Sequence, residues 1–100
     1  MREITCSTIT DAIKKMCIEA ATILPQDVEK ALSQKHDEED SALAKKTLQV
    51  LMDNAKLAQE KQMPICQDTG MAFVYVTMGQ EVHITGGSLN EAIQEGVRQG

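Results

Sequence analysis

Aromatic residues are almost absent from this 100-residue chain, which has one Phe, one Tyr and no Trp. The core must therefore be built from Leu, Ile, Val, Ala and Met, which suits helices. Apolar residues still make up 42% of the sequence, which excludes the composition of a disordered chain. A chain of this length predicts one small domain, residues 1–100, with a modest core.

Basic residues and long apolar runs are also scarce. Ten Lys and Arg stand against 15 Asp and Glu, and the net charge of −5 argues against a nucleic-acid surface. No window approaches the roughly 18 apolar residues of a membrane-spanning helix. The first 15 residues, MREITCSTITDAIKK, lack the apolar run of a secretory signal. We therefore expect neither nucleic acid nor membrane as a partner.

Cysteines are few and unpaired in their spacing. Cys6, Cys17 and Cys66 are an odd number with no C-x-x-C pair, which argues against a disulfide framework and a self-contained zinc site. This usage favours a reducing, cytoplasmic compartment.

Helical patterns dominate residues 8–62. Thr8 and Asp11 resemble a helix-start signal, and apolar residues then recur every three or four positions as far as Leu24. Pro25 can open a second helix, and the acidic run 36–40 is expected to link it to a third. That third helix, 41–61, carries one main apolar stripe. Asn54 interrupts it as a weak helix former, which we interpret as a surface or locally bonded residue.

A strand pair and a last helix are expected after residue 70. Residues 71–78, MAFVYVTM, are β-branched and aromatic, Gly79-Gln80 can form a tight turn, and 81–85 alternates between apolar and polar. Ser88 begins a capping box for a helix over 88–99. The predicted fold is α+β: three helices, a hairpin-like strand pair over 71–85 and a further helix. Since an isolated strand pair is marginal, we expect it to be part of a larger domain.

The loop 63–70 holds the most unusual residues. Pro, Asp, Thr and Gly are ordinary between a helix and a strand, and a single Cys is often a small buried apolar residue. Asp68-Thr69-Gly70 is also the active-site triplet of dimeric aspartic proteases, in which two carboxylates share a proton. Those enzymes are almost wholly β and place the triplet after an apolar strand, whereas a helical pattern precedes it here.

The full run Pro64-Ile65-Cys66-Gln67-Asp68-Thr69-Gly70 resembles the signature of the class I, iron–sulfur fumarase and L-tartrate dehydratase family. The helical N-terminal region and the runs Leu24-Pro25-Gln26-Asp27-Val28 and Asn54-Ala55 agree with it. The resemblance implies a hydro-lyase that adds or removes water across a four-carbon dicarboxylate.

Site roles follow from that resemblance. Cys66 would be one of three cysteines that ligate a 4Fe–4S cluster, leaving one iron position open. Gln67 and Asp68 would contact the substrate. Asp68 would either transfer a proton or hydrogen-bond the substrate hydroxyl, and the sequence leaves both open.

The chain contains only part of what such an enzyme needs. The family's other two cluster cysteines lie after the motif, where this sequence has none, and Cys17 falls on an apolar helix stripe that indicates packing. Arg2 and Arg98 are the only arginines available to clamp a dicarboxylate.

The resemblance therefore implies the N-terminal part of an α subunit or α-like domain, completed by the rest of that subunit and by a β subunit in an oligomer. By itself the chain is expected to be inactive. A small helical scaffold without catalysis is the alternative, and the residues do not separate fumarate or malate from tartrate. Neither His36 nor His83 receives a role.

Overall fold

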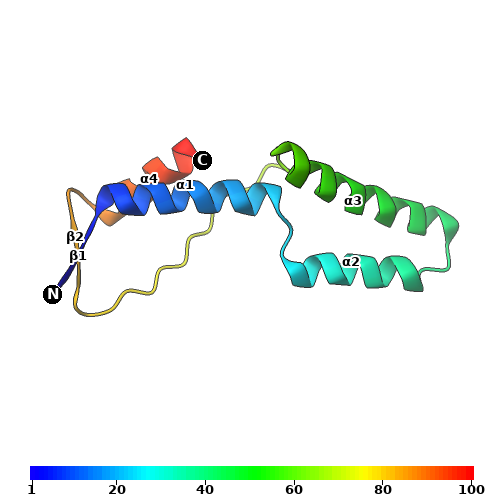
Figure 1. Cartoon of the computed structure of the whole chain (residues 1–100), viewed down its shortest axis with the longest axis horizontal. Helices are drawn as coiled ribbons and strands as arrows, with labels where there is room; N and C mark the ends of the chain where they lie inside the picture. The colour runs from blue at the N-terminus through cyan, green and yellow to red at the C-terminus, as the bar shows by residue number, and fades with distance from the viewer. The chain divides into compact units, whose positions relative to one another are not determined.

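A computed structural model describes residues 1–100 (Figure 1). About 61% of the residues are helical and one small sheet is present, which confirms the α+β class. The elements, in chain order, are β1 (Arg2–Thr5), α1 (Cys6–Thr22), α2 (Gln26–Glu38), α3 (Ala42–Lys61), β2 (Val82–Thr85) and α4 (Leu89–Gln99).

The chain divides into two compact units. The first, here called the sheet unit, comprises Met1–Glu19 and Thr69–Gly100; the second, the helix-pair unit, is Ala20–Asp68. Helix α1 begins in the sheet unit and ends in the helix-pair unit. That residues 1–100 form a single partial domain stays a prediction.

The sheet differs from the predicted strand pair. β1 and β2 are parallel, with Arg2 opposite Val82 and Thr5 opposite Thr85. The strand at 81–85 is confirmed as β2, and the Val82 N–H donates to the Gly79 carbonyl at 3.2 Å in the expected turn. The hairpin-like pair is wrong, because β2 takes its partner from the other end of the chain.

Residues 71–78 form no strand. They run as an extended, exposed connection to β2, and the side chains of Phe73 and Tyr75 are 72% and 92% exposed (Figure 1). The β-branched and aromatic composition predicted a strand, but a strand also needs a hydrogen-bonded neighbour, and none lies beside this segment. Strand propensity alone therefore predicted a strand at 71–78 that the structure does not have.

Helix α1 starts directly after β1. The hydroxyl Oγ1 of Thr5 accepts the Thr8 N–H at 3.3 Å, so Thr5 occupies the N-cap position. The expected start at Thr8 is wrong by two residues, because the sheet brings Thr5 into position at the helix end.

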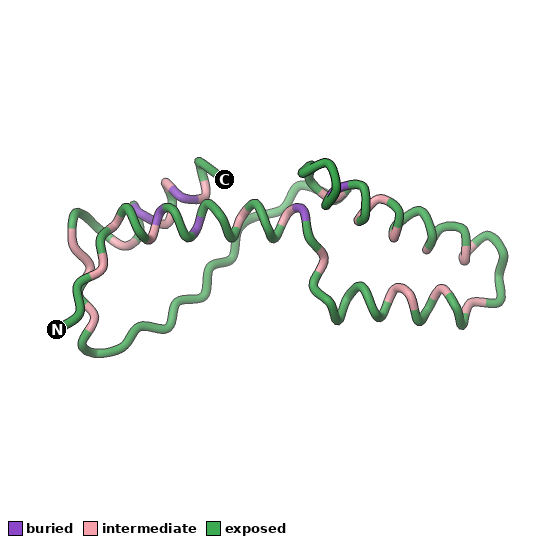
Figure 2. The backbone as a smooth tube through the Cα atoms, in the orientation of Figure 1, coloured by how far each residue is buried: buried purple, intermediate pink, exposed green.

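Packing in the sheet unit is concentrated where α1 meets α4. Ile13 on α1 and Ala92 and Gly96 on α4 are buried, as Figure 2 shows for both helices. A Cβ added to Gly96 would lie 2.6 Å from Ile13 Cβ and 2.8 Å from the Thr10 carbonyl oxygen. Thr10 is itself buried, and its hydroxyl donates to the Ala92 carbonyl at 2.8 Å. Only a glycine at position 96 permits this close approach of the two helices.

The helix-pair unit consists mainly of α2 and α3. The third helix was predicted over 41–61, and α3 begins one residue later, at Ala42. The hydroxyl of Ser41 accepts the Ala44 N–H at 3.3 Å. The expected acidic link at 36–40 is shorter than predicted, because α2 continues to Glu38. That carboxylate accepts hydrogen bonds from Gln34 at 2.9 Å and Lys35 at 3.3 Å, which stabilise the last helical turn.

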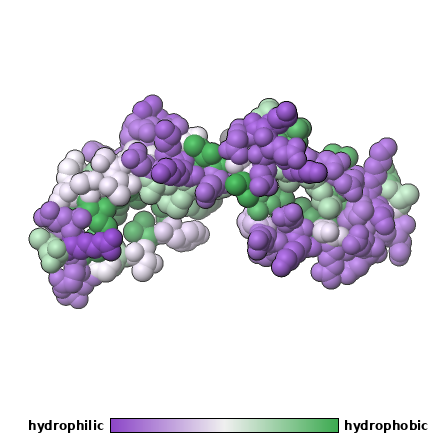
Figure 3. Space-filling model, viewed as in Figure 1, coloured by the Kyte–Doolittle hydropathy of each residue, from purple (hydrophilic) through white to green (hydrophobic).

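Little of the helix-pair unit is buried. Ala58 is the buried residue of α3, and α2 has none. Figure 3 shows hydrophilic side chains over much of α2 and α3 on the face in view. None of the helices combines the length and apolar character that crossing a membrane requires.

Candidate functional site

The loop that carries the sequence motif leaves the C-terminal end of α3. Gln62 adopts a left-handed conformation, with φ 54° and ψ 45°, and the Met63 N–H donates to the Ala58 carbonyl at 3.0 Å. This pattern ends helices, although glycine normally occupies the left-handed position. A side chain there costs roughly 1–2 kcal/mol, so the turn into the loop is a strained one.

Two consecutive backbone groups of the loop are then fixed by the helices. The Ile65 N–H donates to the Ala21 carbonyl, in the last turn of α1, at 2.7 Å. The Cys66 N–H donates to the side-chain oxygen Oδ1 of Asn54, in α3, at 2.9 Å. Sequence reasoning gave Asn54 no part in the site; the available signal was a weak helix former on an apolar stripe.

The side chains that follow are unrestrained. Cys66 is exposed and its thiol is free. Gln67 and Asp68 are exposed, and neither side chain makes a hydrogen bond or ion pair within the chain. The Asp68 carboxylate therefore caps no backbone N–H group of its own turn. The motif thus combines a fixed backbone at Cys66 with three polar side chains that local structure does not use.

The other two cysteines have contacts of a different kind. The Cys6 thiol lies 3.7 Å from the Ser88 carbonyl oxygen, as a weak donor. Cys17 lies close to Gly100: a Cβ added to Gly100 would lie 2.7 Å from the Cβ of Cys17. Both of these thiols belong to the sheet unit, and Cys66 belongs to the helix-pair unit.

As a metal site the chain offers a single suitable group. No three His, Cys, Asp or Glu side chains gather in a way that could hold an ion. The exposed thiol of Cys66 fits one ligand position of an iron–sulfur cluster, since thiolates are the ligands that such clusters take. A cluster with three thiolate ligands would need the other two from elsewhere.

Arg98, one of the two arginines considered for a substrate clamp, has a partner in its own helix. Its Nε donates to Glu95 Oε2 at 2.8 Å, and its Nη2 donates to the other carboxylate oxygen. These hydrogen bonds and one from Gln99 lower the pKa of Glu95 to about 2. The guanidinium is thus engaged by an exposed carboxylate, as in a surface ion pair.

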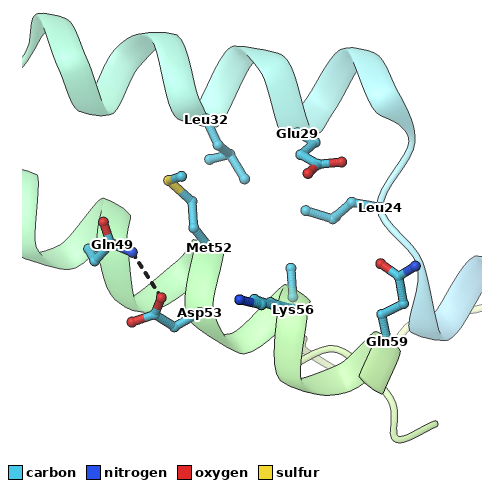
Figure 4. A pocket seen from close by; sticks show the side chains of 9 residues that line it. Leu24, Glu29, Leu32, Gln49, Met52, Asp53, Lys56 and Gln59 are labelled. Atoms are coloured by element: carbon cyan, nitrogen blue, oxygen red, sulfur yellow. Dashed lines mark hydrogen bonds between the residues drawn. The ribbon is translucent and has the colours of Figure 1, made fainter. Parts of the chain in front are cut away.

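A separate cleft of about 410 Å³ lies between α2 and α3 (Figure 4). Leu32 and Met52 face each other across it, and Gln49 donates to Asp53 at 2.8 Å on the α3 side. The residues of the motif do not line this cleft. It is a gap between two helices rather than an extension of the loop.

Comparison with known proteins decides the family. Residues 10–100 match the protein family described as fumarate hydratase (Fumerase). The chain belongs to this family. Membership excludes the aspartic protease interpretation of Asp68-Thr69-Gly70, and the helix before the triplet agrees with that exclusion.

Individual relatives of the family are similar over most of the chain. A Methanocaldococcus jannaschii protein, provisionally named L(+)-tartrate dehydratase subunit alpha, is 37% identical over 92 residues, covering 91% of this chain and 32% of that protein. The L(+)-tartrate dehydratase subunit alpha of Escherichia coli K12 is 29% identical over 90 residues, covering 87% and 30%. The chain thus spans about a third of the length of these relatives.

Proposed function

We propose that this chain contributes a cluster-ligand loop to an iron–sulfur hydro-lyase that reversibly hydrates or dehydrates a four-carbon dicarboxylate. The observation that carries the proposal is the arrangement at residues 66–68. In a member of the fumarate hydratase family, an exposed free thiol on a fixed backbone is followed by an amide and a carboxylate that have no partner in the fold.

Cys66 is the proposed metal ligand. Its thiol is exposed, whereas Cys6 and Cys17 are partly covered by other parts of the sheet unit. When bound, a 4Fe–4S cluster with three thiolate ligands supplies an open iron position that acts as a Lewis acid. The chain provides one of those three thiolates.

Gln67 and Asp68 are the proposed substrate-contacting residues. The amide can donate hydrogen bonds to a substrate carboxylate and accept one from a hydroxyl. The carboxylate of Asp68 can accept a hydrogen bond from the substrate hydroxyl or transfer a proton. Because neither side chain is used within the fold, both remain available for these contacts.

Further parts are required for activity. The names of the two relatives describe alpha subunits of tartrate dehydratases, and each is about three times as long as the match. We therefore propose that the remainder of an α subunit, together with a β subunit, supplies the other thiolates and the cationic groups for the substrate. A cytoplasmic location is consistent with three free thiols.

The experiment compares the 100-residue chain with a complete α subunit that contains it, assembled with its β subunit, under anaerobic conditions. After addition of iron and sulfide, we expect the chain alone to stay colourless and inactive. The assembled enzyme should show 4Fe–4S absorption and EPR signals and turn over L-tartrate, or fumarate and L-malate. A stable cluster on the chain alone would refute the ligand count. Absence of turnover with all three substrates would favour the non-catalytic scaffold.

A further inference from the structure

Asn54 is a polar residue on the apolar stripe of α3. It is half-buried, and it lies seven residues before Lys61, the last residue of the helix, away from the terminal positions where Asn is favourable. An alanine would be the better helix former here. Its side-chain oxygen instead accepts the N–H of Cys66, 12 residues further along the chain, at 2.9 Å.

This bond works together with its neighbour in the loop. The Ala21 carbonyl lies in the last turn of α1, where carbonyl groups have no donor within the helix, and the Ile65 N–H satisfies it at 2.7 Å. Ile65 and Cys66 are thus held at adjacent peptide groups by two different helices. Two such anchors restrict the position and direction of the Cys66 Cα–Cβ bond while the thiol stays exposed.

We infer that Asn54 is a positioning residue that sets the geometry of the ligand loop through the backbone of Cys66. This inference rests on the proposed role of Cys66 as a cluster ligand. A ligand loop that is already held in place loses less conformational freedom when metal binds than a free loop does. Asn54 therefore makes α3 slightly less favourable than an alanine would, and its hydrogen bond orders the backbone of Cys66.

The test measures amide hydrogen exchange in the ¹⁵N-labelled 100-residue chain and in the Asn54→Ala and Asn54→Asp variants. Asn54→Ala removes the acceptor and replaces it with a residue that favours the helix, whereas Asn54→Asp keeps an acceptor oxygen in the same place. We expect the Cys66 amide to exchange at least about fivefold faster in Asn54→Ala, the factor expected for an ordinary hydrogen bond, and to recover protection in Asn54→Asp. The Ala58 amide reports on α3 itself and should not change.

Three results would overturn the inference: unchanged exchange at Cys66 in Asn54→Ala, equal acceleration at Ala58, or no recovery in Asn54→Asp. The second would show that Asn54 supports the helix rather than the loop. The exchange measurement needs no metal, so its result does not depend on whether the proposed function is correct. Faster exchange together with normal iron content in a Cys66→Ala enzyme would leave the hydrogen bond intact as a finding and refute the ligand role.

Discussion

The two units of the chain are held together in different ways. In the sheet unit, α1 and α4 approach so closely that Gly96 has no room for a side chain, and the buried hydroxyl of Thr10 is satisfied by Ala92. In the helix-pair unit α2 buries no residue, and Leu43 of α3 is 77% exposed. There the Cys66 loop is held by individual hydrogen bonds rather than by close packing. Substitutions in the first unit should therefore change stability, and those in the loop should change chemistry.

The largest effect is expected at Asp68. Asp68→Asn keeps the size of the side chain and removes its charge and its capacity to transfer a proton. Because the carboxylate has no partner in the fold, the melting temperature should not change. Turnover in the assembled enzyme should fall by roughly 10²-fold or more, the usual scale for loss of an acid or base. Steady-state kinetics on cluster-loaded enzyme, with iron content as the control, measure this.

Near-normal turnover in that variant would refute the catalytic role of Asp68. A lowered melting temperature would show that the loop also contributes to stability. Stability effects would then not be confined to the sheet unit.

A smaller effect is expected at the helix contact of the sheet unit. Gly96→Ala places a Cβ within 2.8 Å of the Thr10 carbonyl oxygen, a backbone atom that cannot move aside by rotation. Such overpacking typically costs about 1–3 kcal/mol in the free energy of unfolding. Urea denaturation of the 100-residue chain measures it.

The matched control is Gly79→Ala, where the nearest atom, Val82 Cγ2, lies 3.9 Å from the added Cβ. The free energy of unfolding should change much less in Gly79→Ala than in Gly96→Ala. Equal effects at the two glycines would contradict the close contact between α1 and α4.

The smallest effect concerns Glu95, an exposed carboxylate in α4. Hydrogen bonds from Arg98 hold its pKa at about 2, below the ordinary 4.5. A lowered pKa in the folded state means that the stabilising contribution is present above pH 4.5 and is lost as the pH falls toward 2. Glu95→Gln should remove this part of the pH dependence, and since the group is exposed the change should be slight.

The carboxyl ¹³C shift of Glu95 reports the titration directly. A midpoint near 4.5 in the wild-type chain would contradict the ion pair, and Arg98→Gln should raise the midpoint toward that value. Glu38 provides a comparison in the helix-pair unit, since Gln34 and Lys35 also lower its pKa.

Local chemistry was sufficient to predict most helices. Ser88 caps α4 as expected, and Ser41 caps α3 in the same way, because a hydroxyl bonds an N–H three residues along and needs no distant partner. The exposed loop at Cys66 also followed from local signals, since Pro64 and Gly70 interrupt both helix and strand patterns.

The sheet could not be predicted from local patterns. β1 pairs residues about 80 positions away, and its sequence, Arg2–Thr5, contains a single apolar residue. Residues 71–78 have the stronger strand composition and no partner. For the candidate site, the sequence predicted roles for the thiol and its two neighbours, and these roles stay predictions. It did not predict the hydrogen bond from Cys66 to Asn54, because nothing in a helical pattern shows which distant N–H an amide will bond.

The most direct test compares Cys66→Ala with Cys17→Ala in the anaerobically assembled enzyme. Iron and sulfide per protein are measured together with the circular dichroism of the helices. We expect Cys66→Ala to lose the cluster and keep its helices, because the thiol has no packing role on the exposed loop. Cys17→Ala should keep the cluster and lose about 1 kcal/mol of stability through a small cavity. A full cluster in Cys66→Ala, or loss of iron in Cys17→Ala, would show that the wrong thiol has been assigned.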